Sequence, residues 1–167
     1  MRILITGAAG SGTTTLGRAL AERLVSALFD TDDYFWQPTE PPYQQQRTLE
    51  ERRALLAVDL AACQRAVISG SLSDYGEEIE HSLSLVVFLL LDTEIRVRRL
   101  MERETRRFGK ADPEFIEWAG QYEEGRLEGR SRARQEAWLA QRRCPVLRLE
   151  GDLSIQERLN RVLAIID

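Results

Sequence analysis

The sequence predicts an α/β protein in which helices cover both faces of a five-stranded parallel sheet. Short apolar runs alternate along the chain with amphipathic segments, which is the pattern of strands and crossover helices around such a sheet. A glycine-rich segment joins the first apolar run to the first amphipathic one. With 167 residues, the chain is long enough to form one domain with its own hydrophobic core.

Five apolar runs are predicted to be the strands of the sheet. The fourth run is the most apolar of the chain, so we expect it to lie centrally, where both faces of a strand are covered. The predicted strands are residues 3–6, 27–29, 66–69, 83–91 and 145–149.

Helices are predicted between these strands. In the first of them, Leu16, Leu20 and Leu24 recur every four residues and therefore share one face. Three prolines place residues 34–46 in a loop, and three glycines predict breaks in the charged helical region 113–141. The predicted helices are residues 14–26, 48–64, 93–107, 113–141 and 155–166.

The glycine-rich segment has the spacing of a phosphate-binding P-loop. Gly7 and Gly12 are separated by four residues, as in G-x-x-x-x-G-K-[ST]. Such a loop directs successive backbone amides, and the positive end of the following helix, toward phosphate oxygens. We therefore expect a three-layer P-loop NTPase fold and nucleotide binding. The candidate nucleotide contacts are Gly7, Ala8, Ala9, Gly10, Ser11, Gly12, Thr13, Thr14 and Thr15.

Thr13 stands where the motif has its lysine. The lysine brings a cation to the β- and γ-phosphates, whereas a hydroxyl offers only a hydrogen bond, so the loop supports phosphate binding more firmly than catalysis. Two other interpretations stay open. A dinucleotide-binding turn would need a third glycine where Thr15 stands, and a glycine-rich turn between a strand and a helix can also lack any ligand.

Three aspartates follow the second predicted strand. The carboxyl ends of parallel strands share one crevice, so these carboxylates should face the same site as the P-loop. If the segment is extended, Asp30 and Asp32 lie on one side and Asp33 on the other. A carboxylate there can hold a water of the Mg²⁺ shell or accept a proton from an attacking hydroxyl, and Thr14 occupies the motif position whose hydroxyl coordinates Mg²⁺. The structural alternative is a solvated turn with a capping aspartate.

Three more residues are candidate substrate contacts beside Asp32. Asp33 and Trp36 belong to the same acidic and aromatic stretch, although the ring of Trp36 can equally pack the loop. Gly70 lies in a turn of small residues after the third strand, where a substrate can approach the backbone closely.

Two arginine stripes are predicted on helix faces. The first has spacings of three, four and three residues, and the second repeats every four residues, so each aligns on one side of a helix. Arginines can supply the charge that the P-loop lacks, but a solvated charged face explains either stripe as well. The stripes are Arg96, Arg99, Arg103 and Arg106, then Arg126, Arg130 and Arg134.

Composition argues against several other classes of protein. The chain is 43% hydrophobic and 30% charged with a net charge of −4, which is unlike the basic footprint of a nucleic-acid-binding protein. No apolar run approaches the length of a membrane span, and the start leads directly into the P-loop without room for a signal peptide. Cys63 and Cys144 form no metal or redox spacing. We expect a cytoplasmic protein with reduced cysteines and no membrane or nucleic-acid partner.

With these motifs in place, the sequence resembles the small P-loop kinases, which include adenylate kinase, the other nucleoside monophosphate kinases, and shikimate and gluconate kinases. The resemblance covers nearly the full length, including Gly151-Asp152 after the last strand. It implies a monomer of one domain, residues 1–167, that transfers a phosphoryl group from ATP with Mg²⁺ to a small-molecule acceptor. It implies that Asp30 holds Mg²⁺ together with Thr14, and that Asp32 orients or deprotonates the acceptor hydroxyl. It also implies catalytic roles for Arg99 and Arg103 at the start of a mobile lid, at about residues 108–135. Because Thr13 departs from the family pattern, a non-catalytic nucleotide sensor and a slow NTPase remain as alternatives.

Overall fold

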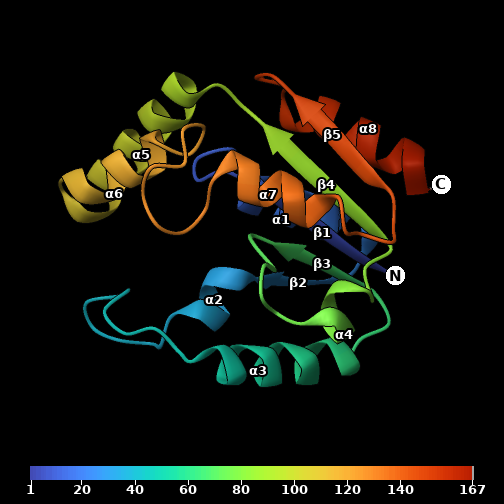
Figure 1. The fold of residues 1–167 in the computed structure, drawn as a ribbon. Coiled ribbons are helices and arrows are strands. Elements are labelled where there is room, and N and C mark those ends of the chain that lie inside the picture. Colours follow the sequence, from blue (N-terminus) through green and yellow to red (C-terminus); the bar gives the residue numbers. More distant parts are fainter. Residues whose placement is uncertain (167) are drawn as a thin grey trace.

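Five parallel strands form a single sheet in the order β2-β3-β1-β4-β5 (Figure 1). The computed structural model describes residues 1–166. The predicted fold class is confirmed, and each predicted strand is present within two residues of its expected bounds. The strands are β1 (Arg2–Gly7), β2 (Ala27–Asp30), β3 (Ala66–Ser69), β4 (Leu85–Leu90) and β5 (Val146–Glu150).

The middle of the sheet is β1, not the more apolar β4. Ile3 of β1 lies opposite Val67 of β3 on one side and Leu85 of β4 on the other. The prediction that β4 is the central strand was therefore wrong by one position. The apolar pattern reports burial on both faces of a strand, and β1 and β4 share that property.

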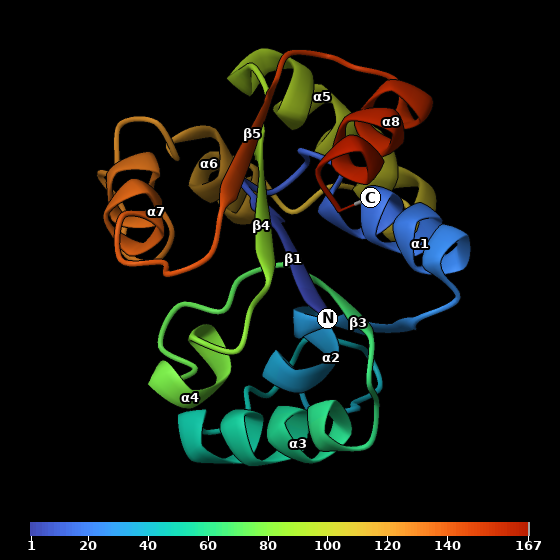
Figure 2. The ribbon, with the colours of Figure 1, turned by 90° about the vertical axis from the view of Figure 1, so that its right-hand side faces the viewer.

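Helices cover both faces of the sheet and complete the three layers (Figure 2). One face packs β1 and β4 against α1 and α8 through Ile3, Leu16 and Val162. The other face packs them against α3 and α7 through Leu56, Val86 and Leu139. The helices are α1 (Thr13–Leu24), α2 (Thr31–Phe35), α3 (Leu49–Ala61), α4 (Glu77–Glu80), α5 (Thr93–Phe108), α6 (Pro113–Gly120), α7 (Arg132–Leu139) and α8 (Ile155–Ile166).

Two short helices, α2 and α4, were not predicted. The aspartates after β2 therefore lie on a helical turn, and the expectation of an extended segment there was wrong. Asp30 caps this turn, since its side chain accepts a hydrogen bond from the backbone amide of Asp32. The predicted breaks in region 113–141 are confirmed, because α6 ends at Gly120 and α7 begins only at Arg132.

Within residues 1–166, no helix combines the length and the apolar character needed to span a bilayer. The same part of the chain holds no cluster of three or more His, Cys, Asp or Glu side chains suited to a metal ion. Cys63 and Cys144 are free thiols that pack, half-buried, against the core beneath α3 and α7.

Candidate functional site

The loop between β1 and α1 has the backbone shape of a phosphate cradle. Gly10 and Gly12 have φ angles of +83° and +95°, a region that favours glycine. A Cβ atom on Gly7 would come within 2.7 Å of the Leu89 carbonyl oxygen, and one on Gly10 within 2.7 Å of the Arg96 carbonyl oxygen. The glycines predicted from spacing are thus required by both backbone conformation and close packing.

Thr14 and Asp30 meet at the edge of this loop, as the sequence predicts. The Thr14 hydroxyl donates a hydrogen bond of 2.8 Å to Asp30 Oδ2, while Asp30 Oδ1 caps α2. Mg²⁺ binds oxygen ligands and usually takes only one or two from the protein, with phosphate oxygens and water completing its shell. The hydroxyl and carboxylate of this pair fit such a role.

Asp32 faces a hollow that opens to solvent beside this pair. The surrounding protein and, second, repulsion from Asp30 raise the pKa of its carboxyl, although Arg130 and Arg103 act in the opposite direction. Burial and Asp30 likewise raise the pKa of Asp33. Both side chains are exposed to solvent, but only that of Asp32 lines the cavity.

The first arginine stripe does not act as a unit. Arg96 is fully buried, contrary to its place in a ligand-facing stripe, and it donates to the carbonyl oxygens of Leu91, Ala9 and Ala119. Arg99 forms an ion pair of 2.5 Å with Asp152. Exposed Arg103 pairs with neighbouring Glu104 at 2.8 Å. Of the four arginines in the stripe, Arg96 is structural, Arg99 and Arg103 lie near the candidate site, and Arg106 is exposed in the last turn of α5.

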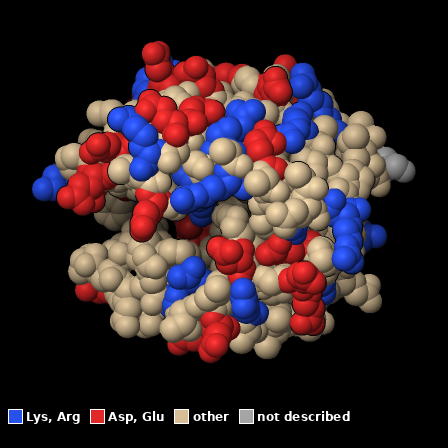
Figure 3. Space-filling model, viewed as in Figure 1, with Lys and Arg blue, Asp and Glu red and all other residues tan. Residues whose placement is uncertain are grey.

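A cavity of about 790 Å³ lies between α2 and the segment that leads into α7. Asp32, Ser71, Tyr75, Arg52 and Arg130 are among the residues that line it. In the space-filling view the molecule is hollowed between its two halves, with arginines and acidic residues on the rims (Figure 3).

Gly70 and Trp36 have structural neighbours at this site. A Cβ atom on Gly70, whose φ is +114°, would lie 1.9 Å from Thr31 Oγ1, and that hydroxyl accepts from the Ser71 amide. The ring of Trp36 packs edge-on against Phe35 and Tyr43. Neither residue is among those that line the cavity, so a substrate contact of either stays a prediction.

Comparison with known proteins places the chain in a family. Residues 3–117 match the family described as "AAA domain". The chain belongs to this family. It is also 40% identical over 171 aligned residues to "Uncharacterized protein YqaC" from Bacillus subtilis (strain 168), covering 96% of this chain and 94% of that protein.

Solved structures similar to this AAA-domain protein share its fold. Shikimate kinase from Bacteroides thetaiotaomicron matches with a TM-score of 0.62 at 19% identity over 99% of this chain and 98% of that one. Deoxyadenosine kinase from M. mycoides with bound dATP matches with a TM-score of 0.63 at 13% identity over 99% of both chains. A gluconokinase from Sinorhizobium meliloti 1021 matches with a TM-score of 0.54 at 19% identity over 98% and 89%. At such identities the likeness shows a P-loop kinase fold.

The AAA-domain protein has two candidate site residues in its cavity that the sequence did not single out. The Tyr75 side chain is 4% exposed, and its hydroxyl has no hydrogen-bond partner among the described residues. Arg52 stacks its guanidinium 3.8 Å from the centre of the Phe35 ring. Neither residue belongs to a motif, and only the fold brings α3 and the turn after β3 together.

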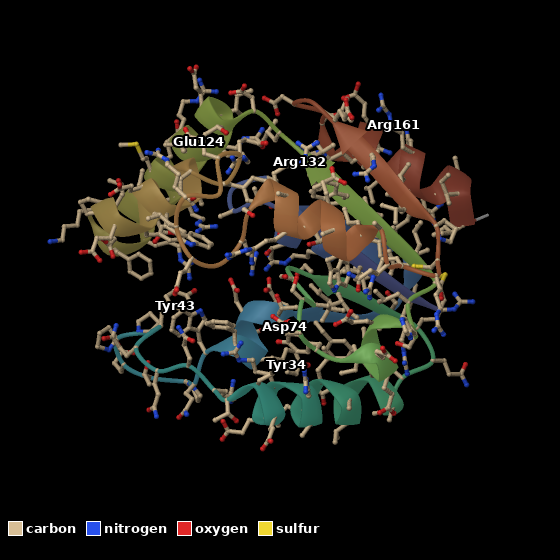
Figure 4. The ribbon with its side chains drawn as sticks, in the orientation of Figure 1. Tyr34, Tyr43, Asp74, Glu124, Arg132 and Arg161 are labelled. Atoms are coloured by element: carbon tan, nitrogen blue, oxygen red, sulfur yellow. The ribbon has the colours of Figure 1, made fainter. Side chains whose placement is uncertain are left out.

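An aromatic bridge links the loop after α2 to the end of α5. Tyr43, on the loop after α2, lies edge-on to Trp36 at 5.8 Å and to Phe108 at 6.4 Å between ring centres. Arg107 donates to the Tyr43 hydroxyl at 3.1 Å. Figure 4 shows Tyr43 on the side of its loop that faces α5 and α6. The loop after α2 and the end of α5 are thereby joined.

Proposed function

We propose that this protein is an ATP- and Mg²⁺-dependent phosphotransferase that acts on a small acceptor bearing a hydroxyl and an anionic group. One observation carries the proposal. Asp30, which is bonded to Thr14 at the P-loop, and Asp32, which lines the cavity, lie two residues apart on the same turn. A phosphate held by the loop and an acceptor in the cavity would therefore be neighbours.

The nucleotide side of the site consists of the P-loop amides with Thr14 and Asp30. Bound Mg²⁺ would neutralise charge on the β- and γ-phosphates. Arg103 extends from α5 close enough to lower the pKa of Asp32, and in this proposal it stabilises charge on the phosphoryl group in flight. Arg99, anchored by Asp152, lies beside the nucleotide, and residues 108–135 form the lid over it.

The acceptor side of the site has one candidate base, Asp32, and three side chains suited to bind an anion, Arg52, Tyr75 and Arg130. Asp32 accepts the proton of the attacking hydroxyl, a role that its raised pKa favours. Arg130 forms no ion pair within the described residues. Its positive charge acts to lower the pKa values of both Asp32 and Tyr75. The charge of Arg52 also acts to lower the pKa of Tyr75. The buried Tyr75 hydroxyl has no hydrogen-bond partner among the described residues, so it can donate a hydrogen bond to the acceptor. Two guanidinium groups around a free phenol favour a carboxylate or phosphate on the acceptor.

Calorimetric titration with Mg-ATP, followed by an ADP-release assay with a panel of hydroxy acids, sugar phosphates and nucleoside monophosphates, tests the proposal. We expect binding by the wild-type protein and release that depends on one class of anionic acceptor. The absence of Mg-ATP binding at millimolar concentration would overturn the proposal. Release at the same slow rate with and without every acceptor would instead identify an NTPase, and binding without any release would identify a nucleotide sensor.

A further inference from the structure

A second buried arginine, Arg158 of α8, lies beneath the P-loop. Its side chain is 2% exposed, and its Nη1 donates a hydrogen bond of 2.9 Å to the Ser11 carbonyl oxygen. A Cβ atom on Gly12 would lie 3.1 Å from the same nitrogen. Glycine at position 12 therefore lets the guanidinium approach the loop closely.

The charge of Arg158 has no direct counter-ion in the described part of the chain. Among residues 1–166, Arg158 makes no ion pair, and its buried Nε has no hydrogen-bond partner. The Asp152 carboxylate favours the charged form of Arg158. Asp152 is itself paired with Arg99, however, and the positive charge of Arg99 disfavours the charged form of Arg158. A buried cation is costly unless an anion compensates it.

The hydrogen bond to Ser11 also sets the direction of a loop amide. In a planar trans peptide the carbonyl and the following N–H point in opposite directions. With the Ser11 carbonyl held by Arg158, the Gly12 N–H points away from α8. Arg96 holds the Ala9 carbonyl in the same way at 3.2 Å, which turns the Gly10 N–H away from Arg96. Neither of these two amides donates to an acceptor among residues 1–166.

We propose that Arg158 supplies, from beneath the loop, the positive charge that Thr13 does not. Through its hydrogen bond to the Ser11 carbonyl it also positions the Gly12 amide of the loop. A polyphosphate on the loop amides is then the counter-ion of its buried guanidinium. This inference rests on the proposed nucleotide binding and names the group that makes a P-loop without lysine effective. Electrostatic attraction acts through the thin loop, in which glycine has no side chain to separate the two charges.

The test compares charge with hydrogen bonding at position 158. Arg158→Lys keeps the charge, whereas Arg158→Gln keeps a donor for the Ser11 carbonyl and removes the charge. Affinities for Mg-ATP and for Mg-tripolyphosphate are measured by calorimetry. We expect Arg158→Lys to bind within about threefold of the wild type and Arg158→Gln to bind at least about tenfold more weakly, which corresponds to ~1.4 kcal/mol. Arg161→Gln, an exposed arginine one turn further along α8 (Figure 4), is the matched control and should bind as the wild type does.

Rescue by a lysine at the motif position distinguishes a charge role from a packing role. Thr13→Lys in the Arg158→Gln background should restore most of the lost affinity, whereas added to the wild type it should change affinity by less than about threefold. Wild-type affinity in Arg158→Gln, equal losses in Arg158→Lys and Arg158→Gln, or no rescue would each overturn the inference.

Two further outcomes keep the inference testable. If Arg158→Gln fails to fold, a gain of about tenfold or more from Thr13→Lys alone would show that the wild-type loop lacks a cation and would overturn the inference. A wild-type protein that binds neither Mg-ATP nor tripolyphosphate would overturn the proposed function together with the inference. Wild-type binding that Arg158→Gln leaves unchanged would overturn the inference alone.

Discussion

Three aspartates within four residues have different surroundings, and the differences set their chemistry. Asp30 is engaged twice, by Thr14 and by the Asp32 amide. Asp33 is not among the residues that line the cavity. Asp32 has no hydrogen-bond partner for its carboxylate in the described chain and lines the cavity. Only Asp32 combines a free carboxylate with a place in the cavity where we propose that the acceptor binds.

Replacement of Asp32 by Asn should separate chemistry from nucleotide binding. The amide keeps the size of the side chain but cannot accept a proton, so acceptor phosphorylation should fall by about 10²- to 10⁴-fold, the usual contribution of a general base. Mg-ATP affinity should stay within about twofold, because the P-loop contacts are unchanged. An ADP-release assay and calorimetry measure the two quantities. Glu22→Gln, on the exposed side of α1, serves as control, and a wild-type rate in Asp32→Asn would contradict the role of Asp32.

The environment of Asp32 also predicts a pH dependence. Burial and Asp30 raise the pKa of this carboxyl, and only its ionised form accepts a proton. The rate should therefore fall with decreasing pH at a higher pH than an ordinary aspartate would give. The native state also holds this proton more tightly than the unfolded state, so the contribution of Asp32 to stability decreases as pH rises from its ordinary pKa through the raised one. A profile of kcat/KM against pH checks the kinetic part, and its acid limb should be absent from the residual activity of Asp32→Asn.

At the scale of elements, the sequence predicts the strands, the longer helices and the P-loop, because hydrophobic periodicity and glycine spacing encode them. The path from β1 through the P-loop into α1 follows from an apolar run, Gly7, Gly12 and a leucine repeat. The five-residue helix α2 does not, because a single turn is marginal by itself and owes its stability to tertiary packing and the Asp30 cap. The pairing of Thr14 with Asp30 follows from the rule that strands of a parallel sheet end at a common edge.

The buried arginines show where such reasoning stops. Arg96 fits an exposed stripe by spacing, yet the fold places it between the P-loop, β4 and α6. The signal for Arg158 was its position four residues before Val162, which puts a charge on the apolar face of α8. A charge on a core-facing position indicates a buried partner, but only the fold identifies that partner as the Ser11 carbonyl.

The turn after β3 provides a prediction about element stability. Gly70→Ala would place a Cβ atom 1.9 Å from Thr31 Oγ1 at a φ of +114°, whereas Gly109→Ala at a φ of +79° meets no atom within 4 Å. Gly109→Ala should therefore lower the free energy of unfolding by only about 1 kcal/mol, because alanine is strained in the left-handed conformation. Gly70→Ala should lower it by about 3 kcal/mol or more, because β3 and α2 must also move apart. Urea unfolding of both variants measures the difference. Equal losses would show that the turn yields without strain.

At the scale of the whole molecule, the site lies between two groups of helices that one continuous sheet joins. The lower half in Figure 1 holds α2, α3 and α4, and the upper half holds α5, α6 and α7. On the open side, the loop after α2 and the end of α5 meet through Tyr43, Phe108 and Arg107. Both halves contribute residues to the cavity, so their separation would determine the width of the proposed acceptor site.

Removal of the Tyr43 ring should therefore loosen two segments that are distant in sequence. Tyr43 is 40% exposed, so Tyr43→Ala should change the free energy of unfolding by only about 1 kcal/mol. Amide hydrogen exchange should nevertheless accelerate in residues 37–46 and also in residues 106–112 at the end of α5, because the ring contacts and the hydrogen bond from Arg107 are lost together. Tyr43→Phe, which keeps the rings in contact, should show a smaller effect, and Val58→Ala on the exposed side of α3 should show none at either segment. Faster exchange confined to residues 37–46 would mean that the aromatic bridge does not couple the two halves, and that the width of the acceptor site is set by the sheet alone.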